Sequence, residues 1–374
     1  MSKTIISVVG ARPNFMKIAP ILRQLQALPD IRSFLVHTGQ HYDDQLSRQF
    51  FVDLALPEPD VNLEVGSGGH GVQTGEMMKR LEAVFEAEKP ALVLVVGDVN
   101  STVAAALVAS KLHIPLAHIE AGLRSFDRRM PEEINRVVTD VLSDLLFVTE
   151  PVGMTHLAQE GISGSRVHLV GDVMIDSVMA ALPGAREAVS RELSWLPKGP
   201  FGLVTLHRPS NVDEPEQLQG ILEALKAVSP RLPLLFPVHP RTRARIAQFG
   251  LQPLLDQIPQ LTLLPPLGYL VFLGLLDKAR LVLTDSGGVQ SEATFLGLPC
   301  LTLRDTTERP ETVEVGANHL LGVDPRAIEP AVAAVLNGTY PPPRVPALMD
   351  GRAAERIAHV IAQFLGESSG DGRK

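Results

Sequence analysis

The feature that most constrains this chain is an alternation of short apolar runs with longer amphipathic stretches. The runs Leu92–Val96 and Leu145–Val148 contain no polar residue, which is typical of parallel strands buried on both faces. Stretches such as Val72–Ala87 have the apolar spacing of surface helices. This alternation predicts right-handed β-α-β units and an α/β fold.

The alternation runs through the chain twice, and each pass predicts one sheet. The first set of expected strands is Ile5–Val9, Phe34–His37, Leu92–Val96, Leu116–Ile119, Leu145–Val148 and Val167–Val170. The second set is Leu203–Leu206, Leu234–Val238, Leu261–Leu264, Leu281–Thr284 and Cys300–Leu303. Between them, Leu182–Pro200 is rich in proline and glycine and is interpreted as the approach to the second sheet. We therefore expect Rossmann-like domains at 1–172 and 173–350, a hinge near Asp172–Ser177, and a final helix over about 351–366.

Composition excludes several classes of protein. The 374 residues carry a net charge of −8, whereas a protein that coats nucleic acid needs a basic face. The longest apolar runs, such as Val271–Leu276, are too short to span a membrane. No charged-then-apolar leader precedes the first strand pattern, and the single cysteine, Cys300, cannot form an internal disulfide. We expect a cytoplasmic protein without a nucleic-acid or membrane partner.

The sequence contains no motif that is typical of metal binding or of nicotinamide binding. There is no cysteine cluster and no His-Glu-x-x-His pattern that would indicate zinc. After the first strand, Pro13 stands where a dinucleotide-binding turn needs glycine. The sequence therefore predicts that the protein uses neither a metal nor a cofactor.

Polar clusters follow the predicted strands at their carboxyl ends. They are Gly10–Asn14, Gly97–Ser101, His118–Gly122, His207–Arg208, His239–Arg241 and Asp285–Gly288. Open α/β sheets bind ligands at this edge. Two such sheets that face each other would form one central cleft.

The turn from Asp285 to Gln290 is a candidate phosphate site. Ser286 can cap the following helix, and Gly287 and Gly288 would let a phosphate approach its positive end. Glu292, farther along that helix, could accept both ribose hydroxyls. The alternative is that the two glycines only make a tight packing turn.

Three basic groups could meet a diphosphate. Arg309 lies in the polar segment Arg304–Glu311, which we expect to be exposed, either as a lid or as a plain solvated loop. Arg12 directly follows a strand-end turn and is a good charge clamp. Lys17 is either a further contact or an exposed residue of the first helical turn.

Carboxylates concentrate in the first half, at Asp98, Glu120, Glu132 and Glu133. A carboxylate at a strand end needs either a partner or a chemical role. Glu120 could form a salt bridge with Arg124, and Glu132 and Glu133 could simply complement a helix N-terminus. His207, after a strand of the second half, could be a buried structural histidine.

Together these motifs resemble the non-hydrolysing UDP-N-acetylglucosamine 2-epimerase family. The segments that carry the resemblance are Gly10–Lys17, His37–Tyr42, Gly97–Asp98, His118–Arg124, Pro131–Arg136, Gly171–Asp176, Asp285–Glu292 and Arg304–Glu311. They occur in the family's order over residues 5 to about 320, so the resemblance covers nearly the whole chain.

The resemblance implies a class-B glycosyltransferase-type fold, with two Rossmann-like domains facing a central cleft. It also implies a homodimer, a C-terminal helix that packs back on the first domain, and no metal or nicotinamide. The implied reaction interconverts UDP-GlcNAc and UDP-ManNAc by anti elimination of UDP to 2-acetamidoglucal and re-addition. Such an activity would serve cell-envelope polysaccharide synthesis.

The resemblance also assigns roles to residues. Proton handling would fall to Asp98, Glu120 and Glu132, with His207 serving either the diphosphate or proton transfer. The UDP contacts would fall on Arg12, Ser286, Gly287, Gly288, Glu292 and Arg309. Gln40 and Gln45 match part of a region where substrate activates some members.

The sequence departs from the family pattern at Pro209–Asn211, Gly69–Gly71 and Ser291. The exact 2-acetamido sugar and any activation by substrate therefore stay open. A glycosyltransferase of the same fold, an epimerase of a related UDP-sugar and a non-catalytic sensor are the alternatives.

Overall fold

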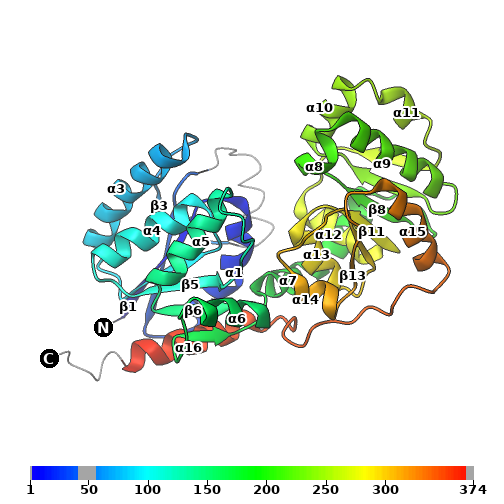
Figure 1. Ribbon diagram of the computed structural model, residues 1–374. Helices are drawn as coiled ribbons and strands as arrows, with labels where there is room; N and C mark the ends of the chain where they lie inside the picture. Colours follow the sequence, from blue (N-terminus) through cyan, green and yellow to red (C-terminus); the bar gives the residue numbers. More distant parts are fainter. Residues whose placement is uncertain (1, 41–55, 368–374) are drawn as a thin grey trace. The chain divides into compact units, whose positions relative to one another are not determined.

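The computed structural model describes residues 2–40 and 56–367, without the side chains of Arg12 and Glu367. It divides into two compact units. Unit 1 consists of Met1–Met179 and Leu348–Lys374, and unit 2 of Ala180–Ala347. Each unit is an α/β body built on its own parallel sheet (Figure 1), as the double alternation of the sequence predicts.

Unit 1 has a sheet in the order β3-β2-β1-β4-β5-β6-β7 among the described residues. Its strands are β1 (Lys3–Val9), β2 (Ile31–His37), β3 (Val61–Asn62), β4 (Leu92–Val96), β5 (Leu116–Ala121), β6 (Leu145–Val148) and β7 (Val167–Leu169). Its helices are α1 (Arg12–Gln26), α3 (His70–Glu88), α4 (Asn100–Lys111), α5 (Pro131–Leu142), α6 (Pro151–Gln159) and α16 (Ala353–Glu367). The order changes direction at β1 and β4, so both strand ends lie at the switch point of the sheet.

Unit 2 repeats this plan with a sheet in the order β10-β9-β8-β11-β12-β13. Its strands are β8 (Gly202–Thr205), β9 (Leu234–Pro237), β10 (Leu261–Leu264), β11 (Leu281–Thr284), β12 (Cys300–Thr302) and β13 (Asn318–Leu320). Its helices are α8 (Pro209–Val212), α9 (Pro215–Val228), α10 (Pro240–Gln248), α11 (Gln252–Asp256), α12 (Tyr269–Lys278), α13 (Gly287–Phe295), α14 (Pro310–Glu314) and α15 (Ile328–Leu336), with a 3₁₀ turn, η1 (Pro325–Ala327).

Successive side chains of each strand point to opposite faces of the sheet, and helices cover both faces. In β11, Leu281 and Leu283 pack with α9 and α15, whereas Val282 packs in a second cluster with α12 and α13. In unit 1, Ile6 and Val8 belong to a cluster with α3 and α4. Strands buried on both faces need continuous apolar sequence, which is why these strands are evident without the structure.

Helix α7 (Val173–Glu192) departs from the sequence-based boundary. The expected hinge, Asp172–Ser177, lies in the start of this helix, and the division between units falls at Met179/Ala180 instead of 172/173. The first half of Leu182–Pro200, interpreted as the approach to the second sheet, is helical because α7 continues to Glu192. Pro183 lies inside the helix, and buried Ala185, Ala188 and Val189 show that packing overrides its low helix propensity.

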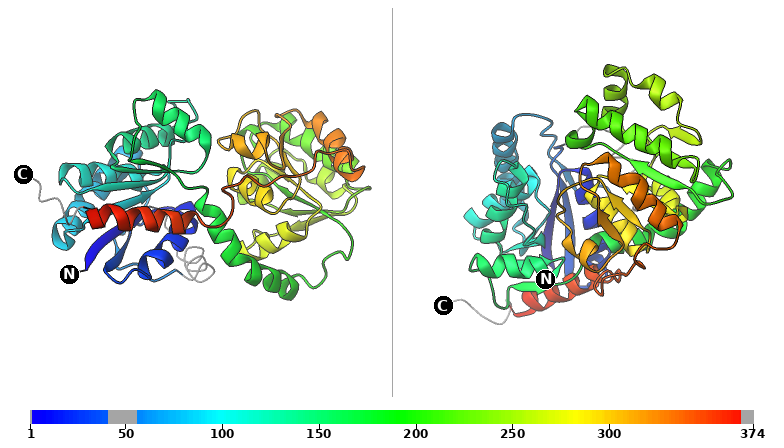
Figure 2. Two further views of the ribbon diagram at one scale, coloured as in Figure 1. Left: turned by 90° about the horizontal axis from the view of Figure 1, so that it is seen from below. Right: turned by 45° about the vertical axis from the view of Figure 1, so that its right-hand side comes forward.

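Helix α16 returns the chain to unit 1 (Figure 2). It packs against α1, and the backbone N–H groups of Ala353 and Ala354 at its start donate to the buried carboxylate of Asp176, at 3.2 and 2.9 Å. Asp176 thus satisfies two of the helix's unpaired N–H groups. Burial raises the pKa of Asp176 to about 6 against the effect of these hydrogen bonds.

Candidate functional site

The turn after β1 is built around Gly10 and Asn14. The Oδ1 atom of Asn14 accepts from the backbone N of Ala11 at 3.0 Å, and its Nδ2 donates to the carbonyl of Val96 at 2.9 Å. A side chain at Gly10 would collide with the hydroxyls of Thr38 and Ser101. The ends of β1 and β4 are therefore fastened together. Arg12 begins α1, but its side chain lies outside the described part.

Glu120 is held in a strained backbone conformation at the end of β5. Its φ of +73° is left-handed, and the pairing of β5 with β6 shifts register between Ile119 and Ala121. A non-glycine residue in this region costs roughly 1–3 kcal/mol and indicates a functional position. The shift presents a carboxylate that is only 7% exposed.

Lys17 pairs with Glu120, and this corrects two alternatives left open by the sequence. The Nζ atom of Lys17 forms an ion pair with Oε2 of Glu120, so Lys17 is not a plain exposed residue. Arg124 does not pair with Glu120, because it contacts Asp140 and Glu160 instead, at 2.7 and 2.6 Å.

Asp98 follows β4 and is the more accessible of the two strand-end carboxylates, with 33% of its side chain exposed. It forms an ion pair with Arg136 of α5, and its carbonyl accepts from Nδ2 of Asn135 at 2.8 Å. Glu133 pairs with Arg136 at 2.7 Å and accepts from Ser125, so its role is structural. Glu132, the neighbouring candidate, is half-buried in the first turn of α5.

Gln40 is tied to the start of α4. Its Oε1 accepts from the backbone N of Ser101 at 3.2 Å, and its carbonyl accepts from Gln73 at 3.3 Å. This side chain therefore caps a helix from outside. Gln45, the other expected regulatory residue, lies outside the described residues.

In unit 2, Asp285 organises the loop that carries His207. Its carboxylate accepts from the backbone N–H groups of His207 and Arg208 at 3.0 and 2.9 Å, and from Nδ2 of Asn211 at 3.1 Å. Nδ1 of His207 lies 3.0 Å from the same carboxylate. Burial would raise the pKa of Asp285, but these hydrogen bonds and the neighbouring His207 lower it.

This arrangement fixes the orientation of the His207 ring, whose side chain is partly exposed. From the sequence, Asp285 was predicted only as the start of a glycine turn. An acidic residue immediately after an apolar strand was the signal that it has a buried function.

The predicted phosphate turn starts helix α13. Ser286 is the N-cap residue, yet among the described residues its side chain makes no capping hydrogen bond, contrary to expectation. Gly287 and Gly288 form the first positions of the helix, where backbone N–H groups are unpaired. The helix end thus keeps the donors that an anion would need.

The segment Arg304–Glu311 is only partly the exposed loop that its polarity suggested, because Asp305 and Thr306 are exposed but its arginines are not. Arg304 and Arg309 are buried, with Arg309 only 8% exposed. Arg304 binds Glu308 through two hydrogen bonds of 2.8 Å, and both side chains lie near Gly287. Arg304 thereby lowers the pKa of Glu308 to about 2 although burial opposes it.

Glu292 and Tyr269 are buried neighbours behind the glycine turn. Glu292 is almost fully buried on α13, and Tyr269 is the first residue of α12. Burial raises the pKa of the Tyr269 hydroxyl, and the adjacent Glu292 raises it further. Tyr269 was not predicted from the sequence as a site residue. A tyrosine at the start of an otherwise apolar helix was the feature that could have identified it.

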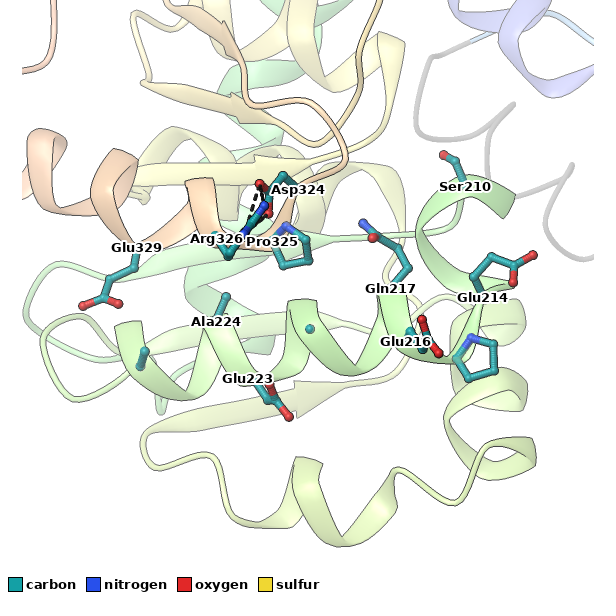
Figure 3. Close-up of a pocket in the computed structure, with 13 residues that line it drawn as sticks. Ser210, Glu214, Glu216, Gln217, Glu223, Ala224, Asp324, Pro325, Arg326 and Glu329 are labelled. Atoms are coloured by element: carbon teal, nitrogen blue, oxygen red, sulfur yellow. Dashed lines mark hydrogen bonds and ion pairs between the residues drawn. The ribbon is translucent and has the colours of Figure 1, made fainter.

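A surface pocket of about 990 Å³ lies elsewhere in unit 2, among α9, η1 and α15 (Figure 3). Its lining includes five carboxylates, those of Glu214, Glu216, Glu223, Asp324 and Glu329, with Arg326 as its one cation. Arg326 is already paired with Asp324. Such a surface repels a diphosphate, so this pocket is not the nucleotide site, and none of the predicted site residues lines it.

The described residues offer neither a metal centre nor a membrane-spanning helix. No group of three or more His, Cys, Asp or Glu side chains is arranged to hold a metal ion in that part of the chain. No helix there is long and apolar enough to cross a bilayer.

The fold and these sites define an α/β protein with two Rossmann-like units, each with polar turns at the carboxyl ends of its strands. A family model described as UDP-N-acetylglucosamine 2-epimerase matches residues 23–362, and the chain belongs to this family. The predicted α/β fold and the predicted family are thereby confirmed.

Known relatives are similar over nearly the full chain. A protein of Methanocaldococcus jannaschii named UDP-N-acetylglucosamine 2-epimerase is 43% identical over 95% of this chain and 97% of its own. A crystal structure of the UDP-GlcNAc 2-epimerase of that organism, in complex with UDP-GlcNAc and UDP, matches with a TM-score of 0.84 at 42% identity, covering 96% of this chain and 99% of the other. A Pseudomonas aeruginosa protein named UDP-2,3-diacetamido-2,3-dideoxy-D-glucuronate 2-epimerase is 43% identical over 96% of this chain and 99% of its own.

Proposed function

We propose that this protein is a non-hydrolysing epimerase that interconverts UDP-GlcNAc and UDP-ManNAc. The observation that carries the proposal is the pair of carboxylates, Asp98 and Glu120, at neighbouring strand ends of a chain that belongs to this family. Both are matched to cations, Arg136 and Lys17. Each cation favours the ionised form of its carboxylate, which is the form that can accept a proton.

The proposed reaction proceeds by elimination and re-addition. A carboxylate removes the C2 proton, the electron pair forms the C1–C2 double bond, and the C1–O bond to UDP breaks. The products are 2-acetamidoglucal and UDP. In the re-addition step, a second group protonates C2 on its other face while UDP adds back to C1, which gives the epimer. We assign Asp98, Glu120 and Glu132 to this proton work.

We assign the nucleotide to the strand-end turns of unit 2. The free N–H groups at Gly287 and Gly288, with the Ser286 hydroxyl, would stabilise the charge that develops on the departing diphosphate. Arg309, Arg12 and Lys17 would add positive charge, and Glu292 would bind the ribose hydroxyls. His207, oriented by Asp285, would serve the diphosphate or a proton transfer.

We further propose that the protein is a homodimer that associates through α5. The buried face of this helix is polar and includes Glu133, Arg136 and Asp140. Its apolar residues face outward instead: Ile134 and Val141 are 47% and 58% exposed, and Val137 and Val138 between them are half-buried. These four residues have the spacing i, i+3, i+4 and i+7 and therefore form one continuous apolar stripe along the helix. In a two-fold dimer, the same stripe of a second copy would cover it.

The proposed setting is the cytoplasm, where the product would supply cell-envelope polysaccharide synthesis. Cys300, the one cysteine of the chain, supports a reducing compartment because it cannot form an internal disulfide. It is a buried free thiol, and burial raises its pKa to about 12, so it is protected from thiolate chemistry.

A related UDP-2-acetamido sugar is a second candidate substrate. The observation in its favour is the Pseudomonas aeruginosa relative, whose name specifies a diacetamido glucuronate and whose identity equals that of the Methanocaldococcus jannaschii relative. Elimination across C1 and C2 would be the same for both sugars. Incubation with each nucleotide sugar separately, with kcat/KM as the measure, decides between them.

One incubation in D₂O tests the proposed chemistry. The protein should convert UDP-GlcNAc to UDP-ManNAc, with deuterium at C2 of the product and of the recovered substrate. It should also release small amounts of UDP and 2-acetamidoglucal. Mass spectrometry and NMR measure all of these. Epimer without deuterium at C2 would contradict the mechanism, and unchanged substrate would contradict the activity.

A further inference from the structure

A buried pair of side chains connects the two turns that carry Asp98 and Glu120. His118 of β5 and Asp140 of α5 are both fully buried, and Nδ1 of His118 lies 2.7 Å from Oδ1 of Asp140. Neither residue reaches the surface, so neither can touch substrate. The family resemblance assigns them no role, and the proposed reaction does not use them.

One end of this pair holds the turn with Asp98. Nε2 of His118 lies 2.9 Å from the carbonyl of Gly97. A carbonyl can only accept, so Nε2 is the donor. The backbone N of Gly97 in turn donates to the carbonyl of Ile119 at 3.0 Å. Gly97 has a left-handed φ of +67°, and these two bonds hold it in that conformation directly before Asp98.

The other end holds the turn after Glu120. The Oδ2 atom of Asp140 accepts from the backbone N of Gly122 at 3.1 Å and pairs with Arg124 at 2.7 Å. Gly122 has a φ of +79°, and a side chain there would lie 2.6 Å from the carbonyl of Gly153. The strained residue Glu120 therefore lies between two positions, His118 and Gly122, that are both bound to Asp140.

Electrostatics make this pair rigid. Burial would raise the pKa of Asp140, but the charges of His118 and Arg124 offset burial and lower it. Asp140 therefore stays ionised and accepts from three donors at once. A fully satisfied buried network of this kind specifies one geometry, whereas a half-satisfied one is costly.

We infer that His118 and Asp140 are positioning residues that hold Asp98 and Glu120 in a fixed relation to each other. The inference rests on the proposed function, in which both carboxylates handle the C2 proton. Two groups that serve opposite faces of one carbon must be placed together, because a displacement of about 1 Å can cost roughly 10²-fold in rate.

Two substitutions of His118 separate the two ends of the pair. Asparagine can reach Asp140 in place of Nδ1 but loses the bond to Gly97. Glutamine can reach Gly97 in place of Nε2 but loses the bond to Asp140. We expect H118N to lower kcat by about 10²-fold and H118Q to lower it less, with the affinity for UDP unchanged in both. The matched control is H168N, because His168 lies in β7 of the same sheet, where its ring lies beside that of Phe147.

The deciding readout is a ratio measured in D₂O. It compares deuterium at C2 of recovered UDP-GlcNAc with the amount of UDP-ManNAc formed. A misplaced carboxylate changes this ratio, whereas a smaller folded fraction lowers both amounts equally. UDP titration calorimetry counts the folded molecules.

An unchanged ratio in both His118 variants, or wild-type kcat in H118N, would overturn the inference. If H118N does not fold, the same deuterium ratio measured for H118Q tests the inference. A wild-type protein that forms neither epimer nor deuterated substrate would instead overturn the proposed function, so the two failures are distinguishable.

Discussion

The strand-end turns of the two units hold their functional groups in opposite ways. In unit 1 the carboxylates of Asp98 and Glu120 are already paired with Arg136 and Lys17. In unit 2 the side chain of the N-cap residue Ser286 does not bind the backbone N–H groups in the first turn of α13. Unit 1 therefore has ionised side chains that can accept a proton, whereas unit 2 offers fixed dipoles to an incoming anion.

The difference is also seen in the backbone at these turns, which is left-handed at Glu120 but not at Gly287 or Gly288. Glu120 has a left-handed backbone because a charged side chain must be aimed. Gly287 and Gly288 need no such conformation, since their contribution is backbone N–H groups and the absence of a side chain. If this comparison is right, substitutions in unit 1 should reduce rate and substitutions in unit 2 should reduce affinity.

The largest effect is expected for D98N. Asparagine keeps the shape of the side chain and removes its basicity, so the epimerisation rate should fall by about 10²–10⁴-fold. UDP affinity, measured by calorimetry, should change little because the nucleotide is assigned to unit 2. A parallel loss of affinity and rate would show that Asp98 is structural and that the two units do not divide the work.

In unit 2, the corresponding test of affinity is E292A. If Glu292 binds the ribose, its loss should weaken UDP binding by roughly 1–3 kcal/mol, as for a hydrogen bond to a charged group. Calorimetry with UDP measures this, and E314A is the acidic control, because Glu314 is exposed on α14. Unchanged UDP affinity in a folded E292A variant would remove Glu292 from the nucleotide site.

An intermediate effect is expected at the outer face of α5. V141E places a charge in the proposed dimer contact, where burial of an unpaired charge costs several kcal/mol. Analytical ultracentrifugation should show dissociation of the variant at concentrations where the wild type is dimeric. The control is W195E in unit 2, because Trp195 is similarly exposed, at 49%. A dimer that tolerates V141E places the contact elsewhere, and a monomeric wild type contradicts the proposed dimer.

The smallest effect concerns backbone strain at Glu120. E120A and E120G both remove the carboxylate, but only glycine adopts a φ of +73° without strain. E120G should therefore unfold at a higher urea concentration than E120A, by about 1 kcal/mol in the free energy of unfolding. The reverse order would mean that the left-handed conformation at this position costs nothing.

Local sequence determined the repeating architecture. Apolar runs such as Leu92–Val96 and Leu281–Thr284 have the same bounds in the structure as in the prediction, because a strand buried on both faces must be apolar throughout. Strands β3 and β13 were missed. Both are short edge strands, and polar residues such as Asn62 and Asn318 are tolerated where only one neighbour pairs.

The sequence by itself determined the two α/β halves, the strand-end motifs and the family. Only the tertiary structure decided how the charges are paired. Lys17 finds Glu120 across 103 residues, and Arg124 turns to Asp140 although Glu120 is nearer in sequence. Arg304 and Arg309 are buried in a segment whose polarity predicted exposure. A local pattern records which groups need burial, but partners for buried charges are chosen by contacts between distant strands and helices, which no local pattern encodes.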